Sequence, residues 1–139
     1  HLRHAETLGF RVLRWPLIAK KPIAKNGAAA FNPTKDYETL FVVAKTNATL
    51  ATRRPTSFVP WTWREREQER YVHPFKKPFS AHEFILRTFW SPGARIHDPF
   101  CGEGSSVLAG RELGYDITGS DCVADHVRRA RLHFETLFA

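Results

Sequence analysis

The chain has 139 residues, which suits one domain, and 42% of them are hydrophobic, which is enough for a packed core and argues against disorder. No apolar run approaches the ~18 residues of a membrane-spanning helix, so we expect no membrane partner. The formal charge of +7 favours a polyanionic partner, although a merely basic soluble protein would carry the same charge.

The two cysteines are far apart in the sequence, and neither lies in a metal-binding or redox motif. We therefore expect no metal site, and a reducing cytoplasm is the simplest location. The chain begins with His1 and contains no methionine, so we expect it to be a piece of a longer protein. The first residues contain no apolar segment of signal-peptide length.

Residues 1–46 predict an edge hairpin of two antiparallel strands, over residues 10–19 and 38–44. Pro16 interrupts the first strand, which indicates an edge position or a bulge because proline donates no backbone hydrogen bond. The long connection is basic, and phosphate contact and simple solvation both explain its lysines. Its candidate phosphate ligands are Lys20, Lys21, Lys25 and Lys35.

Residues 47–72 are predicted to be a linker. A turn-rich stretch opens it, and the mixed charges of residues 64–70 are typical of one or two solvated helical turns. Trp61 and Trp63 either stack on an extruded nucleic-acid base or, as is more usual, cover part of the core.

Residues 73–139 predict alternating helices and strands. Ser80 and Glu83 have the spacing of a capping box, which predicts a helix that ends near residues 91–93. A short strand over residues 94–97 then leads to Asp98. This order continues with a helix over 105–113, a strand over 115–120 that ends in Asp121, and a last helix with an apolar stripe from Val123 to Leu137. The arginines and histidines of that last helix are predicted to face solvent.

The most informative string is Asp98-Pro99-Phe100-Cys101-Gly102-Glu103-Gly104, followed by Ser105 and Ser106. Its order predicts a strand, a tight loop and a helix N-terminus, the place where open parallel sheets bind ligands. The glycines remove Cβ atoms where a ligand must approach the backbone. The third glycine of a dinucleotide fingerprint and the Gly-Lys-Ser/Thr ending of a phosphate loop are both missing, which argues against nucleoside triphosphates.

This string resembles the S-adenosylmethionine motif of DNA methyltransferases that modify the exocyclic amino group of adenine or cytosine. Residues 73–78, His-Pro-Phe-Lys-Lys-Pro, resemble the His-Pro-x-x-Lys-Pro motif of the same family. Gly119-Ser120-Asp121 resembles the glycine and acid that end its second cofactor strand, and residues 9–20 and 36–45 resemble two of its late strands. The order of these matches resembles the permuted subgroup, in which the catalytic half precedes the cofactor half.

The resemblance implies an α/β, Rossmann-like methyltransferase fold, a mixed sheet with an antiparallel edge hairpin, truncated at its N-terminal side. Residues 1–139 would form a single methyltransferase domain, with 1–46 as edge hairpin, 47–72 as linker and 73–139 as the S-adenosylmethionine-binding part. The implied partner is DNA. The implied cofactor residues are His73, Lys77, Pro78, Asp98, Pro99, Phe100, Cys101, Gly102, Gly104, Ser105, Asp121 and Cys122.

Within this set, the Asp98–Gly104 loop would surround the methionine end of the cofactor. Asp121 would accept hydrogen bonds from the ribose hydroxyls, although capping of the last helix is an alternative role. His73, Lys77 and Pro78 would close the site from the other side. We expect Cys101 to be a small packed side chain rather than a nucleophile.

The family's Asp/Asn/Ser-Pro-Pro-aromatic motif, which holds the target amino group and stacks on the flipped base, does not occur in these 139 residues. We therefore predict no catalytic residue in the chain, weak cofactor binding and no turnover by the chain alone. A DNA-binding module without catalysis and an RNA or protein methyltransferase with the same loop remain alternatives.

Overall fold

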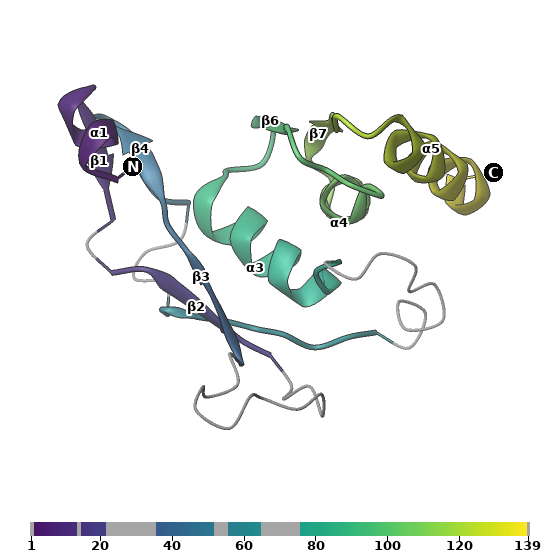
Figure 1. Ribbon diagram of the computed structural model, residues 1–139, viewed down its shortest axis with the longest axis horizontal. Coiled ribbons are helices and arrows are strands. Elements are labelled where there is room, and N and C mark those ends of the chain that lie inside the picture. The colour runs from purple at the N-terminus through teal and green to yellow at the C-terminus, as the bar shows by residue number, and fades with distance from the viewer. Residues whose placement is uncertain (1, 14, 22–35, 52–55, 65–75, 139) are drawn as a thin grey trace.

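Helix α3 (Phe79–Phe89) lies between a group of short strands and an α/β unit in the computed structural model (Figure 1). The structure describes residues 2–13, 15–21, 36–51, 56–64 and 76–138. The other elements are α1 (Leu2–Thr7), β1 (Phe10–Val12), β2 (Leu17–Lys20), β3 (Tyr37–Leu40), β4 (Val43–Lys45), β5 (Phe58–Val59), β6 (Arg95–Asp98), α4 (Ser105–Glu112), β7 (Asp116–Gly119) and α5 (Ala124–Phe138).

The predicted antiparallel hairpin is present, but each of its strands is broken in two. β1 pairs with β4, and β2 pairs with β3 in a register that places Leu17 opposite Leu40. The prediction of two continuous strands was therefore wrong. Pro16 cannot donate to a ladder, and among the described residues a single backbone bond, from the Leu13 N–H to the Val42 carbonyl at 2.9 Å, lies between the two paired segments.

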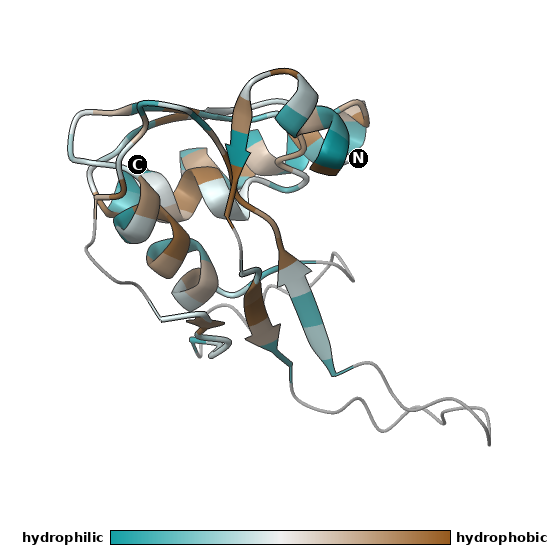
Figure 2. Ribbon diagram, turned by 90° about the vertical axis from the view of Figure 1, so that its left-hand side faces the viewer, coloured by the Kyte–Doolittle hydropathy of each residue, from teal (hydrophilic) through white to brown (hydrophobic). Residues whose placement is uncertain are grey.

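The predicted linker contains a strand, which the sequence analysis missed. β5 pairs in parallel with β2, so that β3, β2 and β5 form a mixed three-stranded sheet. Figure 2 shows β2 mostly brown beside the paler β3, which agrees with the burial of Leu17 and Ala19 in the central strand. Leu17, Ala19, Val59 and Ala81 form a buried cluster, and Trp61 packs against it as predicted.

The second half of the chain has the predicted alternation of elements. β6 and β7 pair in parallel, with Asp98 opposite Gly119. In the described residues, β6 pairs with β7 alone, and neither strand is hydrogen-bonded to the mixed sheet of β3, β2 and β5. The second edge of β6 is thus available to a further strand.

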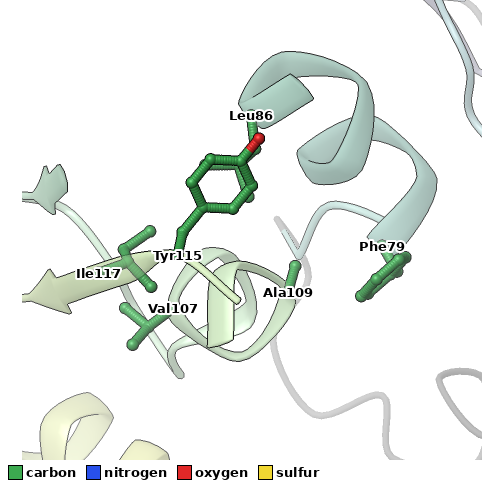
Figure 3. Packing of buried hydrophobic residues seen from close by; sticks show 6 residues of the cluster. All are labelled: Phe79, Leu86, Val107, Ala109, Tyr115 and Ile117. Carbon is green, nitrogen blue, oxygen red and sulfur yellow. The ribbon is translucent and has the colours of Figure 1, made fainter. Parts of the chain in front are cut away.

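A second buried cluster joins α3, α4 and β7. It contains Phe79, Leu86, Val107, Ala109, Tyr115 and Ile117, and Figure 3 shows the Tyr115 ring beside Leu86, with Ile117 and Val107 on its other side. The Tyr115 hydroxyl donates a hydrogen bond to the Trp90 carbonyl at 3.3 Å, which satisfies the polar end of the ring. Because α3 contributes to both clusters, it connects the two halves of the core.

The predicted capping box at the start of α3 is wrong. The N-cap residue is Pro78, and no side chain caps the helix. The Ser80 hydroxyl instead bonds to the backbone of Thr62, and Glu83 pairs with Arg87 one turn later at 3.0 Å. Ser80 therefore anchors the segment after β5 rather than its own helix.

Helix α5 packs through Ala130, which is buried, and through Phe134, which contacts the cluster that joins α3, α4 and β7. Val123, predicted to begin the buried stripe, is 43% exposed and precedes the helix. Throughout the described residues, no helix has both the length and the apolar character needed to cross a bilayer.

Candidate cofactor site

Two strand ends meet at the loop that follows β6. The Ser120 N–H donates to the Asp98 carbonyl at 2.9 Å, and the Cys101 N–H donates to the Ser120 carbonyl at 3.0 Å. These bonds extend the pairing of β6 and β7 beyond the strands themselves. The carboxylates of Asp98 and Asp121 are thereby held at the same loop.

The Asp98 carboxylate holds the loop in shape from within. One of its oxygens accepts a hydrogen bond from the Phe100 N–H at 2.9 Å, and the other accepts one from the Ser106 hydroxyl. The acid thus closes the turn and ties it to the first turn of α4. Phe100 itself projects from this turn with 83% of its surface exposed.

The Asp121 carboxylate reaches the same loop from the end of β7. Its two oxygens accept hydrogen bonds from the Val123 and Gly102 N–H groups, each at 2.9 Å. These backbone donors, with a smaller effect of His126 at 3.5 Å, lower the pKa of Asp121 below its usual value. Asp121 is therefore an ionised acceptor that bonds to the backbone just before α5 and also to the loop.

The two glycines of the loop have different surroundings. Gly102 has a φ of +54°, and a Cβ placed on it would meet nothing within 4 Å. Gly104 has a φ of +83°, and a Cβ there would lie 3.0 Å from the Cβ of Ala130 and 3.3 Å from the Phe134 ring. The backbone at Gly102 is therefore open to a ligand, whereas Gly104 permits close packing of the loop on α5.

The Cys101 side chain is half-buried and packs against Gly119. Burial, with the nearby charges of Asp98 and Asp121, raises the pKa of its thiol, so the reactive thiolate is disfavoured. This agrees with the predicted packing role. Cys122, on the other side of Asp121, is exposed.

Comparison with known proteins identifies the family at this point. The model of the DNA methylase family N6_N4_Mtase matches residues 2–131. The chain belongs to this DNA methylase family. The resemblance to N6/N4 DNA methyltransferases is thus confirmed by a match over most of the chain.

Two solved structures have the same fold. The M1.HpyAVI–SAM complex superposes with a TM-score of 0.71 at 22% identity, covering 94% of this chain and 66% of that one. The PvuII cytosine-N4-specific DNA methyltransferase superposes with a TM-score of 0.73 at 15% identity, covering 96% and 54%. The predicted α/β methyltransferase fold is confirmed.

The Escherichia coli (strain K12) protein YubD, named as a methylase, is 22% identical over 120 residues. This match covers 86% of the present chain and 49% of YubD. The chain thus spans about half the length of this curated relative.

Lys77, from the methylase motif His-Pro-x-x-Lys-Pro, lies in a charged cluster that the sequence did not reveal. Its Nζ is 3.0 Å from Glu38 on β3, and Lys21 is also 3.0 Å from Glu38. Burial raises the pKa of Glu38, but the two lysines outweigh it, so the net pKa is lowered. Pro78 is fully buried at the start of α3.

Other predicted contacts are only partly described. His73, Lys25 and Lys35 lie outside the described residues. Lys20 is exposed at the end of β2, whereas Lys21 is held by Glu38.

Two polar residues in or beside the Asp98–Gly104 loop were missed by the sequence analysis. Glu103 has a side chain that is only 5% exposed and pairs with Arg129 at 3.2 Å, so Arg129 does not simply face solvent as predicted. His82 lies 3.2 Å from Ser105, measured from Nε2 to Oγ. The helical spacing of His82 and Leu86 would have placed this histidine on the face of α3 that meets α4.

An apolar groove elsewhere on the surface is separate from the Asp98–Gly104 loop. It has a volume of about 740 Å³, and its lining includes Val42 of the strand region and Phe89 and Trp90 of α3. None of the predicted cofactor residues that the structure describes lines it. In the described part of the chain, no group of three or more His, Cys, Asp or Glu side chains could hold a metal ion.

Proposed function

We propose that this chain is the cofactor-binding part of a DNA methyltransferase that transfers a methyl group from S-adenosylmethionine to the exocyclic amino group of adenine or cytosine. Family membership supports DNA methylation in general. The observation that carries the cofactor assignment is the Asp121 carboxylate bonded to the Gly102 N–H at an open backbone position. One of the similar structures, the M1.HpyAVI–SAM complex, is a complex of that protein with the same cofactor.

The groups around the loop fit this cofactor. A carboxylate oxygen has two acceptor positions, so each Asp121 oxygen can accept one ribose hydroxyl in addition to its backbone donor. The start of α4 has no side-chain cap, and its first backbone N–H groups favour an anion such as the methionine carboxylate. Phe100 presents an exposed apolar ring beside the same loop, suited to cover the nucleoside.

The remaining sequence-predicted contacts are part of this proposal. Residues of the loop and its flanks would complete the binding surface: Pro99, Cys101, Gly104, Ser105 and Cys122. Lys77 would be a further contact from the residues just before α3, and His73 stays a sequence-based prediction because it lies outside the described residues. Pro78 is fully buried and would act only by fixing the start of α3. Lys77 would add positive charge for the cofactor carboxylate while it stays paired with Glu38.

The cofactor, when bound, supplies an electrophilic methyl group on a sulfonium. The residues of this chain would bind and orient it, which contributes to rate by lowering the entropy cost of reaction. The sequence contains no Asp/Asn/Ser-Pro-Pro-aromatic motif to hold the target amino group, so transfer requires that motif from elsewhere in the enzyme. We propose DNA as the substrate partner, with Lys20 as a phosphate contact.

Calorimetric titration of the chain with S-adenosylmethionine tests the cofactor assignment. We expect binding that Asp121→Ala weakens by about tenfold or more, because hydrogen bonds to a charged group are lost. Asp116→Ala is the matched control, since Asp116 is an exposed acid at the opposite end of β7, and it should bind as the unaltered chain does. No binding, or equal binding by both variants, would contradict the proposal.

The substrate assignment needs the full-length parent enzyme. We expect it to transfer labelled methyl groups to the amino groups of adenine or cytosine in DNA. Labelling of RNA or protein instead would favour the second alternative. Salt-dependent DNA binding by the chain without any response to the cofactor would favour a DNA-binding module.

A further inference from the structure

His82 connects α3 to the first residue of α4. Its Nε2 lies 3.2 Å from the Oγ of Ser105, within hydrogen-bond distance, and its ring is partly buried between the two helices. Ser105 directly follows Gly104, the N-cap residue of α4. The histidine therefore touches a residue of the proposed cofactor site although it lies outside every motif that identified that site.

The charge state of His82 limits what it can do. Its pKa is lowered from 6.5 to about 4, mainly by burial; Asp98 opposes this shift, and Lys77 and Lys76 add to it. The ring is thus neutral at neutral pH. A neutral imidazole has one N–H donor and one acceptor nitrogen, so the tautomer decides whether Ser105 receives or gives a proton in this bond.

The two serines at the start of α4 are not equivalent. The Ser106 hydroxyl donates to Asp98 and is occupied in closing the loop. Ser105 is therefore the hydroxyl of this pair that can donate to a ligand at the helix N-terminus. It can do so only if His82 does not accept its proton.

We propose that His82 is a positioning residue whose Nε2–H donates to the Ser105 oxygen and thereby directs the Ser105 hydroxyl proton toward the carboxylate of S-adenosylmethionine. This role rests on the proposed function, since it concerns the same site. It requires the Nε2–H tautomer with a bare Nδ1. It also predicts that His82 affects binding only of ligands that carry the carboxylate.

Ligand discrimination tests this role. Calorimetry would compare S-adenosylmethionine with its decarboxylated form, which keeps the sulfonium and the amine. We expect His82→Leu to weaken binding of S-adenosylmethionine by about tenfold and of the decarboxylated ligand by less than about twofold, because only the carboxylate loses a charge-assisted bond. His82→Gln, which keeps a donor near the Nε2 position, should restore most of the affinity for S-adenosylmethionine.

A double-mutant cycle places the effect on Ser105. Adding His82→Leu to Ser105→Ala should cause no further loss of S-adenosylmethionine affinity, because the hydroxyl that His82 orients is already gone. Nitrogen-15 NMR of the unaltered chain supplies a readout that is independent of any variant, and we expect a protonated Nε2 and a bare Nδ1.

Each opposite result has a distinct meaning. Equal weakening of both ligands by His82→Leu would make the histidine merely structural, and an Nδ1–H tautomer would also overturn the proposal. Absence of binding of either ligand to the unaltered chain would overturn the proposed function, and the role of His82 with it.

Discussion

Asp98 and Asp121 of the loop unit (residues 95–135) and Glu38 of the strand unit (residues 10–59) are held in different ways. Asp98 and Asp121 accept hydrogen bonds from backbone N–H groups. In the strand unit, Glu38 is held by two lysine side chains, one of which comes from a segment 39 residues away. Phe100 and Val123 donate to acids only two residues away, and Gly102 reaches Asp121 through the pairing of β6 with β7. The Glu38 cluster instead depends on the packing of side chains from distant segments.

This difference assigns different tasks to the two units. Backbone donors hold the carboxylates of Asp98 and Asp121 in place and lower the pKa of Asp121, which suits binding of a small ligand. The Glu38 cluster instead joins β3 to the segment before α3, so it connects the strand unit to the rest of the molecule. Helix α3 makes the same connection through apolar side chains.

The largest expected effect tests whether the two units fold together. Leu17→Ala removes a side chain that is 3% exposed in the cluster of the strand unit, and we expect it to lower the free energy of unfolding by about 3 kcal/mol. Because α3 packs in both buried clusters, the protection of the β7 amides from hydrogen exchange should fall together with the free energy of unfolding. Urea denaturation followed by hydrogen exchange measures both, and unchanged protection of β7 would show that the units unfold separately.

Acid pH should act first at His82 of α3, which contacts the loop unit through Ser105, and only at lower pH at Glu38 and Asp121. The pKa of His82 is about 4 in the folded chain and 6.5 ordinarily, so the unfolded state binds the extra proton and stability is lost as pH falls from 6.5 toward 4. We expect a loss of about 2 kcal/mol over this range. Glu38 and Asp121, whose pKa values are lowered from 4.5 and 3.8, lose their contribution only at lower pH.

Thermal unfolding measured between pH 7 and pH 4.5 checks this order. His82→Gln should flatten the dependence in that range, because it removes the titrating ring. An equally steep curve in the variant would assign the loss of stability to another group.

A smaller effect concerns the packing of the loop on β7. A Cβ at Gly119 would lie 2.7 Å from both the Cys101 Cβ and a Val107 methyl group, so Gly119→Ala should cost about 1–2 kcal/mol of stability. Asp116→Ala, an exposed change on the same strand, should stay within about 0.5 kcal/mol. Chemical denaturation that gave the two variants the same midpoint would disprove the close contact.

The smallest expected effect is the difference between an ion pair with a buried acid and an exposed ion pair. Glu103→Gln should cost about 1 kcal/mol, because Glu103 is buried while its partner Arg129 is partly exposed and retains Asp125. Glu112→Gln removes an exposed pair with Arg64 and should be near neutral. The difference between their unfolding free energies is the quantity to measure, and a larger cost for Glu112→Gln would contradict the burial argument.

The sequence predicted the loop unit well because its signals are local. Asp98 ends a short apolar strand, two glycines and two serines follow, and Asp121 ends the next strand, so the spacing alone predicts strand, loop and helix. The contacts of Glu103 and His82 were missed because they are not local in the sequence. Both partners, Arg129 and Ser105, lie on other helices, and a helix face becomes meaningful only once its neighbour is known.

The strand unit was predicted less accurately because its order depends on distant pairing. Pro16 signalled a disturbance, but not that the strand would break and pair with β3 and β4 separately. β5 has only two residues and is a strand only because β2 lies beside it. In the same way, Ser80 has the spacing of a cap, yet the nearby Thr62 backbone takes its hydroxyl.

The central claim is that the loop unit, and not the strand unit, binds S-adenosylmethionine through Asp121 and the open backbone at Gly102. Nitrogen-15 NMR titration of the chain with this ligand tests it directly, residue by residue. The account predicts that the amide signals of Gly102, Ser105 and Val123 shift on binding, while those of β1 and β4 stay in place. Shifts confined to the strand unit or the apolar groove, or no shifts at all, would contradict it.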